Sequence, residues 1–360
     1  MDIAKIDTNL ASGKTGGADI EWISSLDKRI SLYGVFYDEK SSSYRRVPED
    51  VAAKTLNPGV VALSCCTSGG RIRFVTDSCF ISIKAAIPAT YPMPHMSITG
   101  SHGFSVYADG VYKNRYSPTF GDFAQFCGEW REDCIAFEEK KVISEVRKER
   151  LIEIYFPLYA GVSKLYIGIE PGSVIKEAPA YKHKKPMLFY GSSVTQGACV
   201  SRPGNDYISI LARRLDSDYI NLGFSGNGNA EDAMIDYIAS VDASLYAFDY
   251  NMYPRRKERV LPPYFSIYER IREKHPDSVI LMYDKPGCDF EPYPEREEII
   301  KNAYEKAVSL GDKLVCHIPA YNLLGDYERD ACMVDQAHPN DLGAVRMADA
   351  IYNAVGEFFI

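Results

Sequence analysis

Apolar and polar residues alternate with a period of two along much of the first half of the chain. Residues 71–75 and 80–84 both follow this alternation, as antiparallel strands with one buried face do. Asp109 and Gly110 separate two further runs of this kind, and an Asp-Gly pair in that setting is the strongest short signal for a β-hairpin. Other strands are predicted at residues 60–65, 151–156 and 164–169. Together these strands predict a β-sandwich, with a jelly roll as one form of it.

The pattern changes near residue 180, after a Pro-Gly pair and a basic stretch at residues 182–186. Short apolar runs then alternate with amphipathic stretches of helical period. Strands are predicted at residues 187–190, 219–222, 245–249, 279–283 and 314–318, and helices at residues 206–215, 231–239, 264–274, 295–310 and 341–359. Five strand–helix units predict a flavodoxin-like α/β fold, with a five-stranded parallel sheet and helices on both faces. We therefore expect a β-sandwich domain over residues 1–180 and an α/β domain over residues 181–360.

Length and composition agree with two globular domains. A chain of 360 residues exceeds the usual size of one domain, and 46% hydrophobic with 25% charged residues is ordinary for a globular protein. The 41 Lys and Arg against 49 Asp and Glu leave a net charge of −8, which argues against a nucleic-acid or anionic-membrane partner. No secretory signal or bilayer-spanning run is visible, so we expect a cytoplasmic protein. The nine cysteines include no C-x-x-C pair, and neither a zinc site nor a disulfide framework is indicated.

Candidate chemistry begins where the first parallel strand ends, at Gly191-Ser192-Ser193. A hydroxyl leaving the carboxyl end of such a strand faces the crevice where ligands bind in open α/β sheets. A serine becomes a nucleophile only when a base takes its proton. Asp335 and His338 are three residues apart, so one turn lets the carboxylate accept the Nδ1 hydrogen of the imidazole and fix its tautomer. This spacing predicts a base and its orienting carboxylate in one loop.

Two later strand ends carry groups that are suited to holding an oxyanion. Residues 221–228 are rich in glycine, which lets a backbone N–H approach a substrate oxygen closely. Asn251 follows the third strand and offers a side-chain amide. Together with the N–H of Ser193, these groups predict a three-donor oxyanion hole, in which each donor contributes about 3 kcal/mol to lowering the barrier.

These four stretches, in this order, resemble the conserved blocks of the SGNH (GDSL-type) esterase and acylhydrolase superfamily. The resemblance covers the chain from about residue 186 onward. It implies Ser193 as the nucleophile, His338 as the base, Asp335 as its orienting group, and Gly226 and Asn251 as oxyanion donors alongside the N–H of Ser193. Ser192 stands where the superfamily usually has aspartate, and Asp249 stands where it usually has glycine. The register of the first block favours Ser193 over Ser192 as the nucleophile.

The first half resembles the β-sandwich module of a subgroup of two-domain carbohydrate esterases, at residues 101–107 and 154–162. That resemblance implies an acetylated oligosaccharide, or another small ester, as the substrate. The implied mechanism needs no metal or organic cofactor, and the sequence leaves a homo-oligomer open. Arg202 and Tyr250 are candidate substrate-binding residues, although a solvated loop arginine and a packed tyrosine are ordinary alternatives.

Two other functions fit parts of the pattern. The same serine chemistry would serve a lipase or thioesterase acting on an ester without a sugar, and the preferred acyl-chain length would separate that enzyme from an acetylesterase. A carbohydrate-binding protein with a vestigial esterase domain is an alternative of another class. The presence of Ser193, His338 and Asp335 together favours an active enzyme over that binding protein.

Overall fold

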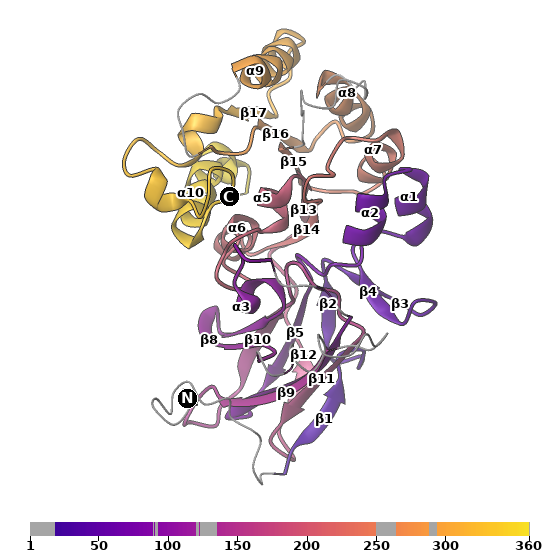
Figure 1. Ribbon diagram of the computed structural model, residues 1–360, viewed down its shortest axis with the longest axis vertical. Coiled ribbons are helices and arrows are strands. Elements are labelled where there is room, and N and C mark those ends of the chain that lie inside the picture. The colour runs from indigo at the N-terminus through magenta and orange to yellow at the C-terminus, as the bar shows by residue number, and fades with distance from the viewer. Residues whose placement is uncertain are drawn as a thin grey trace.

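The computed structural model describes residues 19–88, 90, 93–119, 122, 135–249, 264–287 and 294–359. An antiparallel β-rich region forms one end of the molecule and an α/β region forms the other (Figure 1). None of the helices within the described ranges is long and apolar enough to span a bilayer.

The β-rich region consists of two antiparallel sheets that enclose one core. The first sheet has the order β1-β11-β6-β9, and the second has β12-β5-β10-β7-β8 with β2 paired to β5. Their bounds are β1 Glu21–Ser24, β2 Ser31–Tyr33, β5 Arg71–Thr76, β6 Phe80–Ile87, β7 Phe104–Ala108, β8 Val111–Tyr116, β9 Ile135–Val142, β10 Arg150–Tyr155, β11 Lys164–Ile169 and β12 Ile175–Glu177. Ile72 and Ile154 of one sheet share a buried cluster with Ile83 and Ile167 of the other. The predicted antiparallel region is therefore confirmed, whereas the jelly-roll connection stays a prediction.

The predicted hairpin is also present. Strands β7 and β8 pair directly, and the two residues between them, Asp109 and Gly110, have φ of +51° and +75°. Two positive φ values in a two-residue loop match the twist of the flanking strands, and Asp-Gly adopts them at low cost.

The strand predicted at residues 60–65 is wrong. The structure has a helix there, α2 (Pro58–Leu63), preceded by α1 (Glu49–Lys54). The side chain of Asn57 accepts the N–H of Gly59 at 3.0 Å, and Pro58 occupies the first turn. Both features start helices, so this N-cap signal outweighs the strand preference of the short apolar run.

Helices α1 and α2 lie on the α/β region rather than on the sandwich (Figure 1). Ala52 and Val60 share a buried cluster with Leu188 and Tyr190 of the parallel sheet. A short β-hairpin, β3 (Phe36–Asp38) and β4 (Ser43–Arg45), precedes them. The first half of the chain thus contributes to the core of the second, and a domain boundary at residue 180 stays a prediction.

The α/β region contains a five-stranded parallel sheet with the order β14-β13-β15-β16-β17. Its strands are β13 His183–Gly191, β14 Ser217–Gly223, β15 Leu245–Asp249, β16 Val279–Tyr283 and β17 Val315–Ile318. Its helices are α5 Ser193–Gln196, α6 Tyr207–Leu215, α7 Asp232–Ile238, α8 Tyr264–Lys274, α9 Pro294–Ser309 and α10 Asp341–Val355. Each element lies where the sequence predicted a strand or helix, apart from the one-turn α5, and the flavodoxin-like order is confirmed.

Alternate residues of β13 face the two sides of this sheet. Phe189 belongs to the cluster that contains α6 and α10, whereas Leu188 and Tyr190 belong to the cluster that contains α7, α8 and α9. Strand β13 has β14 on one side and β15 on the other, so the connections leave it in opposite directions. Such a switch point opens a crevice at the carboxyl ends of the strands.

Candidate active site

Ser193 is the first residue of a one-turn helix at the carboxyl end of β13. Ser192 caps this helix, because its hydroxyl accepts the N–H of Val194 at 3.1 Å. Ser193 is only 8% exposed. The predicted serine therefore lies at the switch point of the sheet, on a backbone that the cap holds in place.

The β-rich region fastens the helix that carries Ser193. A four-residue helix is not stable by itself, and its carbonyls need partners. The hydroxyl of Tyr159 donates to the carbonyl of Ser193 at 3.2 Å, and the hydroxyl of Ser68 donates to the carbonyl of Gln196 at 2.6 Å. The side-chain amide of Gln196 donates in turn to the carbonyl of Leu158 at 3.2 Å. Residues from the first half of the chain thus set the position of the serine.

The structure brings a histidine and an aspartate to this serine from the far end of the chain. Nε2 of His338 lies 2.9 Å from Oγ of Ser193, although the two residues are 145 positions apart. Nδ1 of His338 lies 2.8 Å and 3.0 Å from the two carboxylate oxygens of Asp335. A carboxylate at Nδ1 selects the tautomer whose Nε2 can accept a proton from the serine.

Hydrogen bonds within the loop hold Asp335 in this position. Its Oδ1 accepts the backbone N–H groups of Ala337 and His338, both at 2.8 Å. Partial burial works to raise the pKa of Asp335, but the hydrogen bonds from His338 and Ala337 outweigh burial and hold the pKa below its usual value. Asp335 is therefore a carboxylate near neutral pH, and it can stabilise a positively charged imidazole.

Gly226 lies in the turn after β14, which is fastened to the helix that carries Ser193. Gly226 follows β14 with φ of +66°, and a Cβ at this position would have no atom within 4 Å. The neighbouring N–H of Ser225 donates to Oε1 of Gln196 at 2.9 Å, which fastens this turn to α5. Among the residues that the structure describes, neither the N–H of Gly226 nor that of Ser193 has an acceptor.

A second aspartate, Asp249, is hydrogen-bonded to Ser192 next to the candidate nucleophile. The sequence did not indicate this contact. Oδ1 of Asp249 accepts the N–H of Ser192 at 2.6 Å, and Oδ2 accepts its hydroxyl at 2.9 Å. Complete burial raises the pKa of Asp249 to about 7, although the hydrogen bonds from Ser192 and Thr195 act in the opposite direction. A Cβ on Gly191 would overlap Oδ1 of this carboxyl group, so the glycine makes the contact possible.

His95 and Cys199 also lie beside His338, and no sequence spacing pointed to them. The ring of His95 is 5.5 Å from that of His338, measured between centroids, and Cys199 has φ of +68°. The candidate ligand atoms of the three residues lie within 4.8 Å of one another, so they could hold a soft divalent metal ion. Partial burial, with a smaller contribution from Asp335, raises the pKa of the Cys199 thiol to about 12, which disfavours its binding to a metal.

The remaining predicted site residues lie elsewhere or outside the described part of the chain. Arg202 donates from Nη1 to the hydroxyl of Tyr107 at 2.6 Å, and its guanidinium carbon lies 3.7 Å from the ring centroid of Tyr112. It is thus held against the β7–β8 hairpin, and its role in substrate binding stays a prediction. Tyr250 and Asn251 lie outside the described residues.

Two protein-family profiles match the chain. Residues 184–355 match the GDSL-like Lipase/Acylhydrolase family, and residues 20–175 match a family described as the N-terminus of Esterase_SGNH_hydro-type. Among curated proteins, none matches the sequence significantly.

Several solved structures are similar over nearly the whole chain. A GDSL-like lipase candidate from Bacteroides ovatus is 26% identical with a TM-score of 0.77, and the match covers 94% of this chain and 98% of that one. A salicylyl-acyltransferase from a tetracycline biosynthetic pathway is 17% identical with a TM-score of 0.74, covering 94% and 97%. A family two carbohydrate esterase from Clostridium thermocellum, solved with cellohexaose, is 12% identical with a TM-score of 0.61, covering 90% and 97%. At such low identity, the last two similarities concern the fold alone.

Proposed function

As a member of the SGNH (GDSL-like) esterase and acylhydrolase superfamily, this chain is a carboxylic ester hydrolase, and we propose that it removes O-acetyl groups from a carbohydrate. The observation that carries this proposal is the chain of hydrogen bonds from Ser193 through His338 to Asp335. A hydroxyl, an imidazole and a carboxylate linked in this order are what acyl transfer through a serine requires, which supports the proposal.

In the proposed reaction, Oγ of Ser193 attacks the ester carbonyl carbon while Nε2 of His338 takes the hydroxyl proton. The carbonyl π electrons move to the oxygen and form a tetrahedral oxyanion. When this intermediate collapses, the C–O bond to the sugar breaks, and the imidazolium gives its proton to the leaving sugar hydroxyl. Water then repeats both steps on the acyl-enzyme and releases acetic acid, with Asp335 stabilising the imidazolium each time.

The oxyanion is held by the N–H groups of Ser193 and Gly226 in this proposal. Neither donor has an acceptor within the described ranges of the chain, and the bond from Ser225 to Gln196 fixes one relative to the other. Asn251 is the third proposed donor, by its place in the superfamily pattern. Because fixed donors need not reorganise as charge develops, each lowers the barrier by about 3 kcal/mol.

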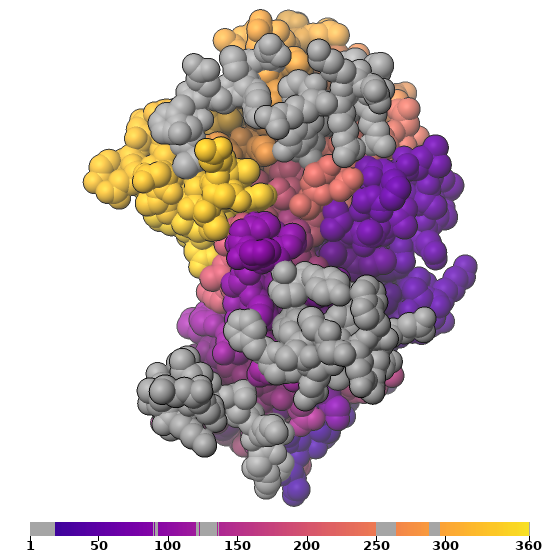
Figure 2. Space-filling view, viewed as in Figure 1, coloured from indigo at the N-terminus to yellow at the C-terminus, as the bar shows by residue number. Residues whose placement is uncertain are grey.

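A carbohydrate substrate is supported by the way the β-rich region reaches this site. Helix α3 (Ile98–Ser101) lies against the α/β region, coloured purple beneath the yellow C-terminal part in Figure 2. The hydroxyls of Ser97 and Thr99 donate to the carbonyl of Ser201 at 2.8 Å and 2.6 Å. The same segment presents the exposed ring of His95 next to His338, where it can bond a sugar hydroxyl. The family two carbohydrate esterase solved with cellohexaose has the same overall fold.

An O-acetyl group is the simplest ester that a sugar hydroxyl carries. We therefore propose acetyl as the group transferred.

The test is a screen of acetylated oligosaccharides, with loss of acetyl groups followed by mass spectrometry. We expect the wild-type protein to deacetylate at least one of them and Ser193→Ala to be inactive. Ser192→Ala is the matched control, because it removes a hydroxyl one residue away; it should keep measurable turnover, although it loses the cap of α5, worth about 1 kcal/mol, and the bond to Asp249. Full turnover by Ser193→Ala would contradict the mechanism, and a preference for acyl chains of about eight carbons or more would contradict the acetyl assignment.

A further inference from the structure

A second hollow lies between the β-rich and α/β regions, at the end of the parallel sheet opposite to Ser193. It has a volume of about 410 Å³, within the range of pockets that hold small molecules. Ser217, which begins β14, lines it, whereas the other end of β14, Gly223, pairs with Gly191 next to the serine. A strand of this length spans roughly 20 Å at about 3.3 Å per residue. The hollow is therefore separate from the candidate active site.

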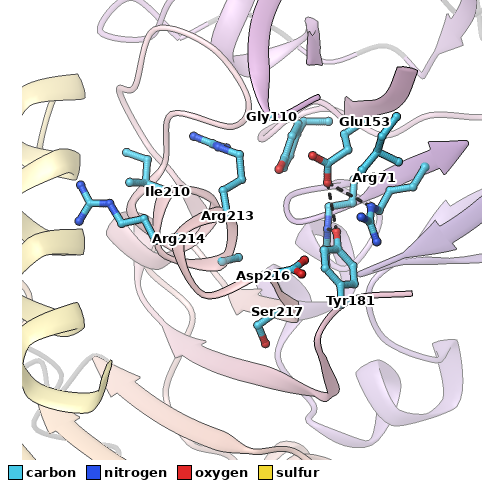
Figure 3. Close-up of a pocket in the computed structure, with 13 residues that line it drawn as sticks. Arg71, Gly110, Glu153, Tyr181, Ile210, Arg213, Arg214, Asp216 and Ser217 are labelled. Carbon is cyan, nitrogen blue, oxygen red and sulfur yellow. Dashed lines mark hydrogen bonds and ion pairs between the residues drawn. The ribbon is translucent and has the colours of Figure 1, made fainter. Parts of the chain in front are cut away.

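Arginine side chains from both regions converge on this hollow. Figure 3 shows Arg213 and Arg214 of α6 on one side, and Arg71, Glu153 and Tyr181 from the β-rich side on the other. Arg73 also lines it, so four arginines face two carboxylates, those of Glu153 and Asp216. The lining therefore carries a positive formal charge, although the chain as a whole is acidic.

Three of these arginines already have carboxylate partners. Nε of Arg73 lies 3.2 Å from Oε1 of Glu153, and Nη1 of Arg214 lies 2.5 Å from Oδ1 of Asp349. Arg71 is paired with Asp218.

Arg213 differs, because it has no ion pair among the described residues. Its guanidinium lies 4.5 Å from the ring centroid of Tyr107 and 5.5 Å from that of Tyr155. Nη1 of Arg213 is buried and has no hydrogen-bond partner within the described part of the chain. A desolvated cation with an unpaired donor is unfavourable unless an anion accompanies it.

We propose that this hollow binds a small molecule through a phosphate or carboxylate group that pairs with Arg213. A planar guanidinium offers parallel N–H donors that match the oxygens of such a group, and low local dielectric strengthens the pair. The hydroxyl of Tyr181 and the carboxylate of Glu153 supply further polar contacts for a hydroxylated remainder of the ligand. Because both regions line the hollow, the ligand also bridges them.

The experiment is a thermal-denaturation titration of the full chain with inorganic phosphate, at constant ionic strength maintained with chloride. We expect a saturable rise in Tm with phosphate, and Arg213→Gln should weaken the apparent affinity at least tenfold. Arg270→Gln is the matched control, because it makes the same charge change at an exposed ion pair with Asp232 and should bind phosphate like the wild type. Citrate, run in parallel, reports whether carboxylates bind in the same place.

Two further measurements distinguish a loss of phosphate binding from a loss of folding. Without phosphate, Arg213→Gln should still unfold cooperatively, at a somewhat lower Tm because it loses the contacts of the guanidinium with Tyr107 and Tyr155, so the effect of phosphate is measured from each variant's own Tm. Leu151→Glu places a carboxylate in the same hollow and should also abolish the phosphate effect. Equal Tm shifts with phosphate, citrate and chloride, or equal phosphate shifts in Arg213→Gln and Arg270→Gln, would overturn the proposal.

Discussion

Asp335 and Asp249 both lie at the carboxyl edge of the parallel sheet, but in opposite surroundings. Asp335 is in a partly exposed loop, where N–H donors and an imidazole keep its pKa low. Asp249 is fully buried at the end of β15, and burial raises its pKa to about 7 although Ser192 donates two hydrogen bonds to it. The comparison teaches that hydrogen bonds keep a carboxylate charged only where desolvation is limited. We infer that the role of Asp335 depends on its negative charge. The role of Asp249 depends on how its buried carboxyl group fits against Gly191 and Ser192.

Among the substitutions that test this comparison, Asp335→Asn should have the largest effect. An amide can hold the imidazole in the wrong tautomer and cannot stabilise its positive charge, so kcat/KM should fall by roughly 10⁴-fold. Steady-state ester hydrolysis measures this effect. Asp326→Asn makes the same chemical change at an exposed position upstream in the chain and should leave kcat/KM unchanged. A loss of less than tenfold in Asp335→Asn would show that its charge is not needed.

Gly191→Ala tests the shape of the buried site. The added methyl group would overlap Oδ1 of Asp249, and neither the β13 backbone nor the fully buried carboxyl group can move without breaking bonds to Ser192. We expect a loss of about 4 kcal/mol in the free energy of unfolding, measured by urea denaturation.

Gly226→Ala is the control for this substitution, because its Cβ meets open space. It should cost about 1 kcal/mol for the positive φ alone. Equal losses in the two variants would mean that the overlap at Gly191 is relieved at little cost.

Asp249→Asn gives the clearest pH signature. Because the folded-state pKa is raised from 3.8 to about 7, the folded protein holds this proton more tightly than the unfolded chain does. The contribution of Asp249 to stability should therefore fall as pH rises from about 4 to 7, by at most about 1.4 kcal/mol per pH unit, and level off above that range. Asp249→Asn should remove this slope in urea denaturation at several pH values. An unchanged slope would contradict the raised pKa.

The sequence predicted those parts of the site that depend on local spacing. Asp335 and His338 share one loop, and Ser193 lies just after a recognisable strand. Their order along the chain was therefore enough to predict that they meet at the carboxyl edge of the parallel sheet. The parallel sheet was predictable for the same reason, because each strand and helix has its own hydrophobic period.

The contact between Asp249 and Ser192 was not predictable, because it depends on the register of β13 against β15, which sets Gly191 opposite Asp249. One signal was nonetheless present: Ser192 replaces the superfamily's usual aspartate, while Asp249 replaces its usual glycine. The helix α2 was missed because the short apolar run at residues 60–63 fits a strand or a helix equally well, whereas Asn57-Pro58 marks a helix start. His95 carried no spacing signal at all.

The most direct test of the central claim is labelling with a fluorophosphonate, whose phosphorus a nucleophilic serine attacks with loss of fluoride. Peptide mass spectrometry then identifies the modified residue. We predict a single adduct on Ser193 that forms at least 100-fold more slowly in His338→Ala, since the base is needed to activate the hydroxyl. An adduct on Ser192, or labelling of Ser193 at the same rate without His338, would contradict the account.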